Sequence, residues 1–98
     1  MKTILQFGFK NGVPEGVPVI DCRAIPNPYH ASDDPKEVAR IVRASKYFNA
    51  LTMKACWALA HRDTIAIGCT HGVHRSGEVA KEVAKATGAK IEKYKNTY

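Results

Sequence analysis

The stretch IGCTHGVHRSG, residues 67–77, lies between a strand-like apolar run and a run with helical spacing. Within it, Cys69 is followed, after five intervening residues, by Arg75 and then by serine and glycine. The pattern predicts a strand that ends at the cysteine, a tight turn, and a helix that begins near the arginine. Backbone N–H groups in such a turn point inward, and the first N–H groups of the helix add the positive end of its dipole. This stretch is therefore typical of a loop that holds an oxyanion.

The side chains of the loop suit such a ligand. Gly72 lets the backbone approach closely, where a Cβ would obstruct. Arg75 can bind two oxygens at once with its planar fork, and His71 and His74 add further donors. Phosphate fits this set best, although sulfate and carboxylate also fit. The plain alternative is an ordinary strand-to-helix turn, with Ser76 as the helix N-cap and the arginine in solvent.

The spacing of cysteine, arginine and serine also resembles the phosphate loop of cysteine-dependent protein tyrosine and dual-specificity phosphatases. That resemblance implies that Cys69 attacks phosphorus as a thiolate, with Arg75 as the phosphate clamp and Ser76 assisting departure of the thiolate. Such an enzyme needs a general acid, and Asp33 or Asp34 lies where one is expected. The alternative is a structural thiol that takes no part in chemistry.

Three motifs occur in one order along the chain: FGFKNGVP at 7–14, DCRAIPNP at 21–28, and AIGCT at 66–70 continuing to HRS at 74–76. This series resembles the C-terminal domain of the RNase adapter protein RapZ family and spans nearly the whole chain. The resemblance implies a domain that binds an amino-sugar phosphate and a small regulatory RNA and that assembles into homo-oligomers. It implies a phosphate site formed by Asn27, Thr70, Gly72, His74 and Arg75.

Loop and resemblance together give one predicted set of ligand-binding residues. The set consists of Asn27, Thr70, His71, Gly72, Val73, His74, Arg75 and Ser76. Two residues that end the second predicted strand, Asp21 and Arg23, are expected to support this site or to pair with each other.

Apolar patterning predicts a single α/β domain over residues 1–98, with a small, mostly parallel sheet flanked by helices. The strands are expected at 3–9, 17–23, 63–68 and 89–95. The second of them is almost continuously apolar, which predicts burial on both faces. A first helix should start at Asp34-Pro35 with Asp34 as its N-cap, and a second should follow a break near 45–49. The last helix should span about 77–87 and end at Gly88, with the ligand site at the carboxyl ends of the strands.

Composition narrows the class of partner. The chain has 98 residues and a formal net charge of +6, which predicts an anionic partner, either a phosphorylated small molecule or RNA. A basic C-terminal segment with tyrosines suits RNA, although an edge strand protected by lysines has the same pattern. No run is long enough to span a membrane, and we expect neither a cofactor nor a metal site.

Three cysteines without framework spacing favour a reducing, cytoplasmic setting. Cys22 is expected at the end of a strand that neighbours the strand of Cys69. The two thiols could therefore form a regulatory disulfide, or both could simply fill the core.

Overall fold

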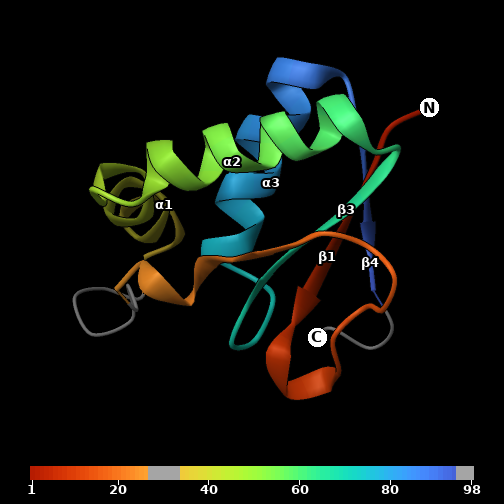
Figure 1. Cartoon of the computed structure of the whole chain (residues 1–98). Helices are drawn as coiled ribbons and strands as arrows, with labels where there is room; N and C mark the ends of the chain where they lie inside the picture. The colour runs from red at the N-terminus through yellow and green to blue at the C-terminus, as the bar shows by residue number, and fades with distance from the viewer. Residues whose placement is uncertain (27–33, 95–98) are drawn as a thin grey trace.

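The structure, a computed structural model, describes residues 1–26 and 34–94. Its four strands form one sheet in the order β2-β3-β1-β4, and each neighbouring pair is parallel (Figure 1). The strands are β1 (Thr3–Gly8), β2 (Val19–Asp21), β3 (Thr64–Cys69) and β4 (Lys90–Lys93). The predicted α/β class with a small parallel sheet is confirmed.

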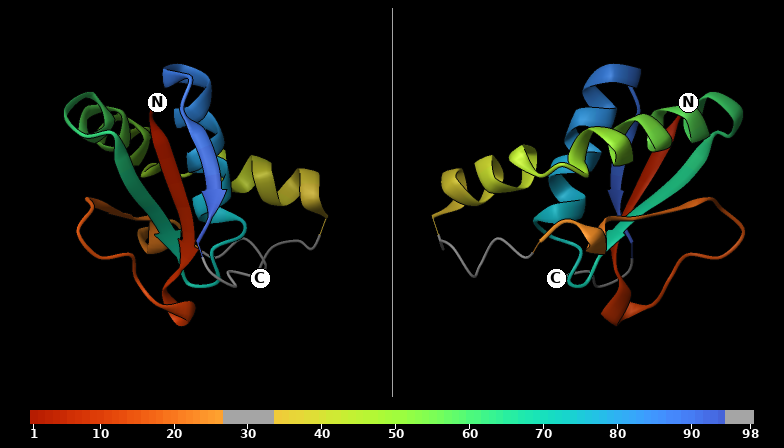
Figure 2. Two further views of the ribbon diagram at one scale, coloured as in Figure 1. Left: turned by 90° about the vertical axis from the view of Figure 1, so that its right-hand side faces the viewer. Right: turned by 60° about the vertical axis from the view of Figure 1, so that its left-hand side comes forward.

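Three α-helices lie on the same side of this sheet, as the views in Figures 1 and 2 agree. They are α1 (Pro35–Ala44), α2 (Phe48–His61) and α3 (Arg75–Thr87), and two short 3-10 turns, η1 (Phe9–Asn11) and η2 (Cys22–Ala24), follow the first two strands. Helices α2 and α3 pack on the sheet and on each other, whereas α1 packs on the other two helices. No helix in the described ranges is long and apolar enough to cross a membrane.

The signals at the helix ends act as predicted. The Asp34 side chain accepts a hydrogen bond of 3.1 Å from the Lys36 N–H, and Pro35 occupies the first turn of α1. Gly88 ends α3 with φ of 76°, a left-handed conformation that glycine adopts without a Cβ penalty. Helix α3 begins at Arg75, two residues earlier than expected, because the turn after β3 tightens directly into helical backbone at His74.

The core lies between the sheet and the helices. Apolar strand side chains meet the buried stripes of α2 and α3, and the fully buried members include Ile4, Ile65, Ile67, Val79 and Val83. Arg43 of α1 forms ion pairs with Glu78 at 2.9 Å and Glu82 at 2.7 Å, which fixes the first helix against α3.

Strand β2 and helix α2 are both less buried than their apolar sequences suggest. Strand β2 is not buried on both faces: it lies at the sheet edge, is three residues long, and buries only Ile20. Its apolar run is cut short because the chain turns into η2 at Cys22. Helix α2 is apolar on two sides, and its outer side leaves Met53 and Trp57 exposed at 71% and 68%.

Strand β3 carries a glycine where the sheet has no room for a side chain. An ideal Cβ on Gly68 would lie 2.3 Å from Cζ of the Phe7 ring on the neighbouring strand β1. Phe7 is fully buried, so its ring cannot swing into solvent to relieve the clash. The glycine thus makes room for a large buried aromatic ring against the strand that carries Cys69.

Replacing Gly68 by Ala is expected to lower the free energy of unfolding by about 1–3 kcal/mol, the usual cost of overpacking a core. Urea-induced unfolding measures the change. A control substitution, Met53→Ala, removes an exposed side chain and should change stability by less than about 0.5 kcal/mol. A Gly68→Ala protein as stable as the wild type would contradict this account of the packing.

Candidate functional site

The connection between β3 and α3, residues 70–74, rests on strand β1. The Lys10 N–H donates to the Thr70 carbonyl at 3.2 Å, and the buried Gln6 side chain donates from Nε2 to the Gly72 carbonyl at 2.6 Å. An ideal Cβ on Gly8 would lie 2.6 Å from the backbone carbon and oxygen of His71, so only glycine permits this approach. Gly72 itself has φ of 80°, a left-handed conformation. The turn is therefore held in one shape by contacts from its neighbouring strand.

Arg75 points into the protein. It is only 9% exposed, and its guanidinium donates from Nη1 to the Ile25 carbonyl at 3.0 Å and from Nη2 to the Thr70 hydroxyl at 3.0 Å. A longer contact of 3.5 Å joins Nη1 to the Arg23 carbonyl. The guanidinium thus joins the loop to η2 and the residue after it. The plain alternative, an arginine in solvent beside a Ser76 cap, is wrong for this turn.

Three of the five guanidinium N–H donors have protein acceptors within the described residues. The remaining donors of Arg75 keep the capacity to bind oxygen atoms of a ligand. A buried, positively charged group with spare donors is the chemistry that an anion site requires.

Cys69 is also inside the turn, with 3% of its surface exposed. Its thiol lies 3.3 Å from the Ser76 hydroxyl, and the backbone N–H groups of Ser76 and Gly72 are directed at its sulfur. Burial alone would raise the pKa of this thiol. The hydrogen bonds from Ser76 and Gly72, together with the positive charge of Arg75, outweigh burial and lower the pKa of Cys69 below its ordinary value.

The turn keeps further backbone donors. Within residues 1–26 and 34–94, the N–H groups of His71 and Val73 have no hydrogen-bond acceptor. These two N–H groups add to those of the first turn of α3, because the first N–H groups of any helix lack an intrahelical partner. The turn can therefore offer a ligand both backbone N–H groups and a guanidinium.

The other predicted residues have mixed outcomes. The Asp34 side chain serves as the N-cap of α1, a structural role that occupies its carboxylate and lends no support to general-acid chemistry. Asp21 and Arg23 pair with each other, Oδ2 to Nη2 at 2.8 Å, and this bond lowers the pKa of the Asp21 carboxyl. Asn27 and Asp33 lie outside the described residues.

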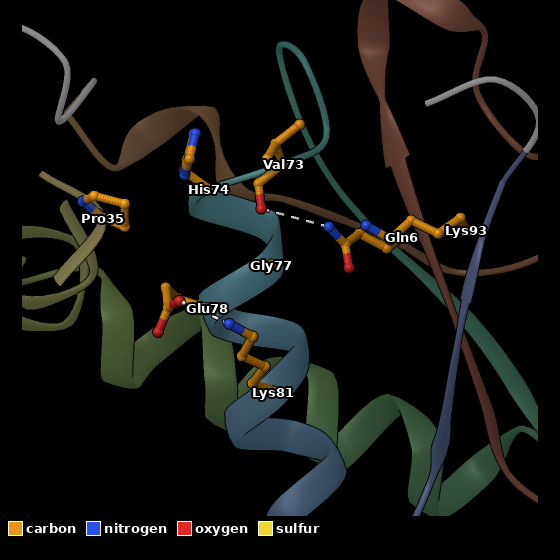
Figure 3. A pocket seen from close by; sticks show the side chains of 8 residues that line it. All are labelled: Gln6, Pro35, Val73, His74, Gly77, Glu78, Lys81 and Lys93. Carbon is orange, nitrogen blue, oxygen red and sulfur yellow. Dashed lines mark hydrogen bonds and ion pairs between the residues drawn. The ribbon is translucent and has the colours of Figure 1, made fainter. Parts of the chain in front are cut away.

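The sequence analysis did not predict a hollow that lies beside the turn. It has a volume of about 350 Å³ and lies between α3, β1 and β4 (Figure 3). The residues that line it are Gln6, Pro35, Val73, His74, Gly77, Glu78, Lys81 and Lys93. A polar glutamine inside the apolar strand TILQFG is the one sequence signal that could have drawn attention to it.

This hollow has a basic wall formed by Lys81 and Lys93, and Glu78, the one acidic residue among the described residues that line it, pairs with Lys81 at 3.3 Å. Burial, and then the nearby charge of Lys81, lower the pKa of Lys93. Burial also lowers the pKa of His74, which belongs both to the turn and to the hollow, while Glu78 acts in the opposite direction. Among the described residues, no group of three or more histidine, cysteine, aspartate or glutamate side chains could hold a metal ion.

A parallel sheet whose strand β3 passes through a tight turn into α3, with a buried cysteine and arginine in that turn, defines an α/β domain with a Cys-x5-Arg loop at the strand ends. The sequence pattern of the RapZ C-terminal domain matches residues 2–97, so the chain belongs to that family.

Relatives agree with this membership. A "nucleotide-binding protein" of Desulfovibrio desulfuricans is 37% identical over 101 residues, which cover 85% of this chain and 33% of that protein. Another of the same description, from Acidobacterium capsulatum, is 32% identical over 111 residues, covering 95% of this chain and 36% of its own. The chain spans about a third of the length of the curated relatives it matches.

The ionisation of Cys69 can be measured directly. The ultraviolet absorbance of a thiolate, taken as the difference between the wild type and Cys69→Ser, should rise at a lower pH than for a free thiol, which titrates near about 8.5. In Ser76→Ala the rise should move to higher pH, because the side-chain hydrogen bond between Cys69 and Ser76, which lowers the pKa of the thiol, is gone while burial remains.

Thr52→Ala is the matched control, since the Thr52 hydroxyl has no hydrogen-bond partner among the described residues and lies on α2. It should leave the titration unchanged. A Cys69 midpoint at or above that of a free thiol would show that burial, not hydrogen bonding, dominates in the turn.

Proposed function

We propose that this domain binds the phosphate group of a phosphorylated small molecule, a sugar phosphate or a nucleotide, in the turn formed by residues 69–76. The observation that carries the proposal is the buried Arg75 guanidinium, which keeps spare donors inside a turn whose N–H groups at His71 and Val73 lack acceptors in the described part of the chain. A dianionic oxyanion satisfies both sets of donors at once.

Further support comes from charge and from family. The net charge of +6 favours anions at long range, and the basic wall of the neighbouring hollow adds local positive charge. The relatives' description as nucleotide-binding proteins is in keeping with a phosphorylated ligand, although it refers to proteins about three times as long. In this proposal Thr70, Gly72, Val73, His74 and Ser76 complete the cradle; Asn27, outside the described residues, remains a contributor expected from the family resemblance alone.

Arg75→Ala should weaken binding of inorganic phosphate, or of a sugar phosphate, by at least about a hundredfold in isothermal titration calorimetry. Each charge-assisted hydrogen bond contributes ~1.5–3 kcal/mol, and two would be lost. Arg75→Lys keeps the charge without the fork and should recover only part of the affinity. Arg40→Ala, which removes an equal charge paired with Glu37 on α1, is the matched control and should bind like the wild type.

Circular dichroism and thermal unfolding establish that each variant is folded before its affinity is compared. A folded Arg75→Ala protein with undiminished affinity would remove the proposal. Titration with single-stranded RNA in place of the small ligand tests the other phosphate source: RNA binding that falls steeply with salt and survives Arg75→Ala would assign RNA to a different surface.

A second candidate function is suggested by position: the Cys69 thiol lies in the same turn as Arg75, 3.3 Å from the Ser76 hydroxyl. A thiolate there could attack phosphorus while Arg75 holds the non-bridging oxygens and Ser76 stabilises the sulfur as it departs. The leaving oxygen would need a proton, and with Asp34 engaged as a helix cap, Asp33 is the remaining predicted donor.

The purified, reduced wild type should then hydrolyse an aryl phosphate, and Cys69→Ser should not. Cys56→Ser, a change at a partly buried cysteine on α2, is the control and should keep full turnover. An inactive wild type, or a Cys69→Ser protein that is equally active, would leave the domain as a binding module only.

A further inference from the structure

Cys22 and Cys69 lie side by side on neighbouring strands. The register of β2 and β3 pairs Asp21 with Gly68, and each cysteine is the residue that follows its member of this pair. Asp21 has extended backbone, φ −92° and ψ 109°, so Cys22 is placed as if the strand continued by one residue. Adjacent strands are about 4.8 Å apart, and a disulfide requires Cα atoms about 4.4–6.8 Å apart.

The two side chains also share a face of the sheet. Residues paired across parallel strands point to the same side of the sheet. Two residues earlier, Ile20 is paired with Ile67, and these side chains point to the same side as the two cysteines. Both cysteines belong to the same buried core cluster as these isoleucines. The third cysteine, Cys56, is on α2 and only packs against that cluster from outside.

We propose that Cys69 is a site of reversible oxidation and that Cys22 is its resolving thiol. The Cys69 thiolate attacks hydrogen peroxide: a sulfur–oxygen bond forms, the oxygen–oxygen bond breaks, and hydroxide leaves and is protonated to water. The sulfur has then lost two electrons to the peroxide. The Cys22 sulfur next attacks the sulfenic acid, the sulfur–sulfur bond replaces the sulfur–oxygen bond, and the departing hydroxide takes the thiol proton as water.

The order of events follows from the environments of the two thiols. Cys69 keeps 3% of its surface exposed and has a lowered pKa, whereas Cys22 has no exposed surface. Burial raises the pKa of Cys22 to about 12, and the negative charge of Cys69 is the next cause. Oxidation of Cys69 to a neutral sulfenic acid removes that charge, so Cys22 becomes easier to deprotonate only after its neighbour has reacted.

The disulfide would act on the turn. In the reduced protein the Cys69 thiol donates to the Ser76 hydroxyl, and its sulfur accepts from the backbone N–H groups of Ser76 and Gly72, which helps to hold the turn closed. A bond to Cys22 draws the sulfur toward β2 and away from these donors. We therefore expect weaker phosphate binding after oxidation; this regulatory part rests on the proposed function, whereas formation of the disulfide does not.

The experiment treats the whole chain with hydrogen peroxide, with intact mass and non-reducing peptide mapping as readouts. The wild type and Cys56→Ser should each lose two hydrogen atoms, link the peptides of Cys22 and Cys69, and recover on addition of dithiothreitol. Cys22→Ala should instead gain one or more oxygen atoms at Cys69. Cys69→Ala should leave Cys22 unmodified, and thermal unfolding confirms that these variants are folded.

A wild type that gains oxygen without forming the bond, a bond that includes Cys56, or a covalent dimer would overturn the proposal. Calorimetry with inorganic phosphate then compares the oxidised and reduced wild type. A phosphate affinity that falls by roughly tenfold after oxidation would support the regulatory part, because coupling between two sites usually changes affinity by about this factor. Equal affinity in both forms would refute the regulatory part alone, and no binding in the reduced form would refute the proposed function while leaving the disulfide intact.

Discussion

The buried guanidinium of Arg75 is the constraint on which the rest of this site depends. A charge removed from water without partners costs several kcal/mol, so its surroundings must supply acceptors. Here they come from two segments far apart in the sequence, the Ile25 carbonyl after η2 and the Thr70 hydroxyl in the turn. Satisfying the guanidinium therefore fixes the position of the turn relative to the end of β2. The short turn η2 (Cys22–Ala24), capped by the Asp21 side chain that accepts from the Arg23 N–H, leads the chain to the Ile25 carbonyl that the guanidinium uses.

Glycines make this arrangement sterically feasible. Gly8 lets the backbone of His71 lie against β1, and Gly68 makes room for the Phe7 ring beneath β3. Gln6 then anchors the turn from the same strand through the Gly72 carbonyl. Strand β1, which contributes no residue to the predicted ligand set, thus determines much of the shape of that site.

The sequence was sufficient to predict the helix caps, the parallel α/β class and the turn, because Asp34-Pro35, Gly88 and the 67–77 stretch carry their structural meaning locally. It was insufficient where tertiary position decides. The apolar run of β2 resembles a central strand, yet strand order places it at an edge. The direction of Arg75 depends on a carbonyl fifty residues away. Gln6 could be assigned to a strand, but its contact with the turn depends on how β1 and β3 pair.

In the proposed complex the turn would hold two anionic groups close together, the Cys69 thiolate and a phosphate. The Cys69 sulfur uses N–H groups of Gly72 and Ser76, while an incoming phosphate would need those that remain, at His71 and Val73, together with Arg75. Two negative charges at such short range repel strongly in a water-poor setting, so the bound ligand should favour the neutral thiol and the thiolate should disfavour the ligand. By linkage, protonation of this sulfur should therefore tighten the hold of the turn on a bound anion. If the turn binds phosphate as proposed, the charge of Cys69 affects that affinity whether or not its sulfur ever forms a bond to phosphorus.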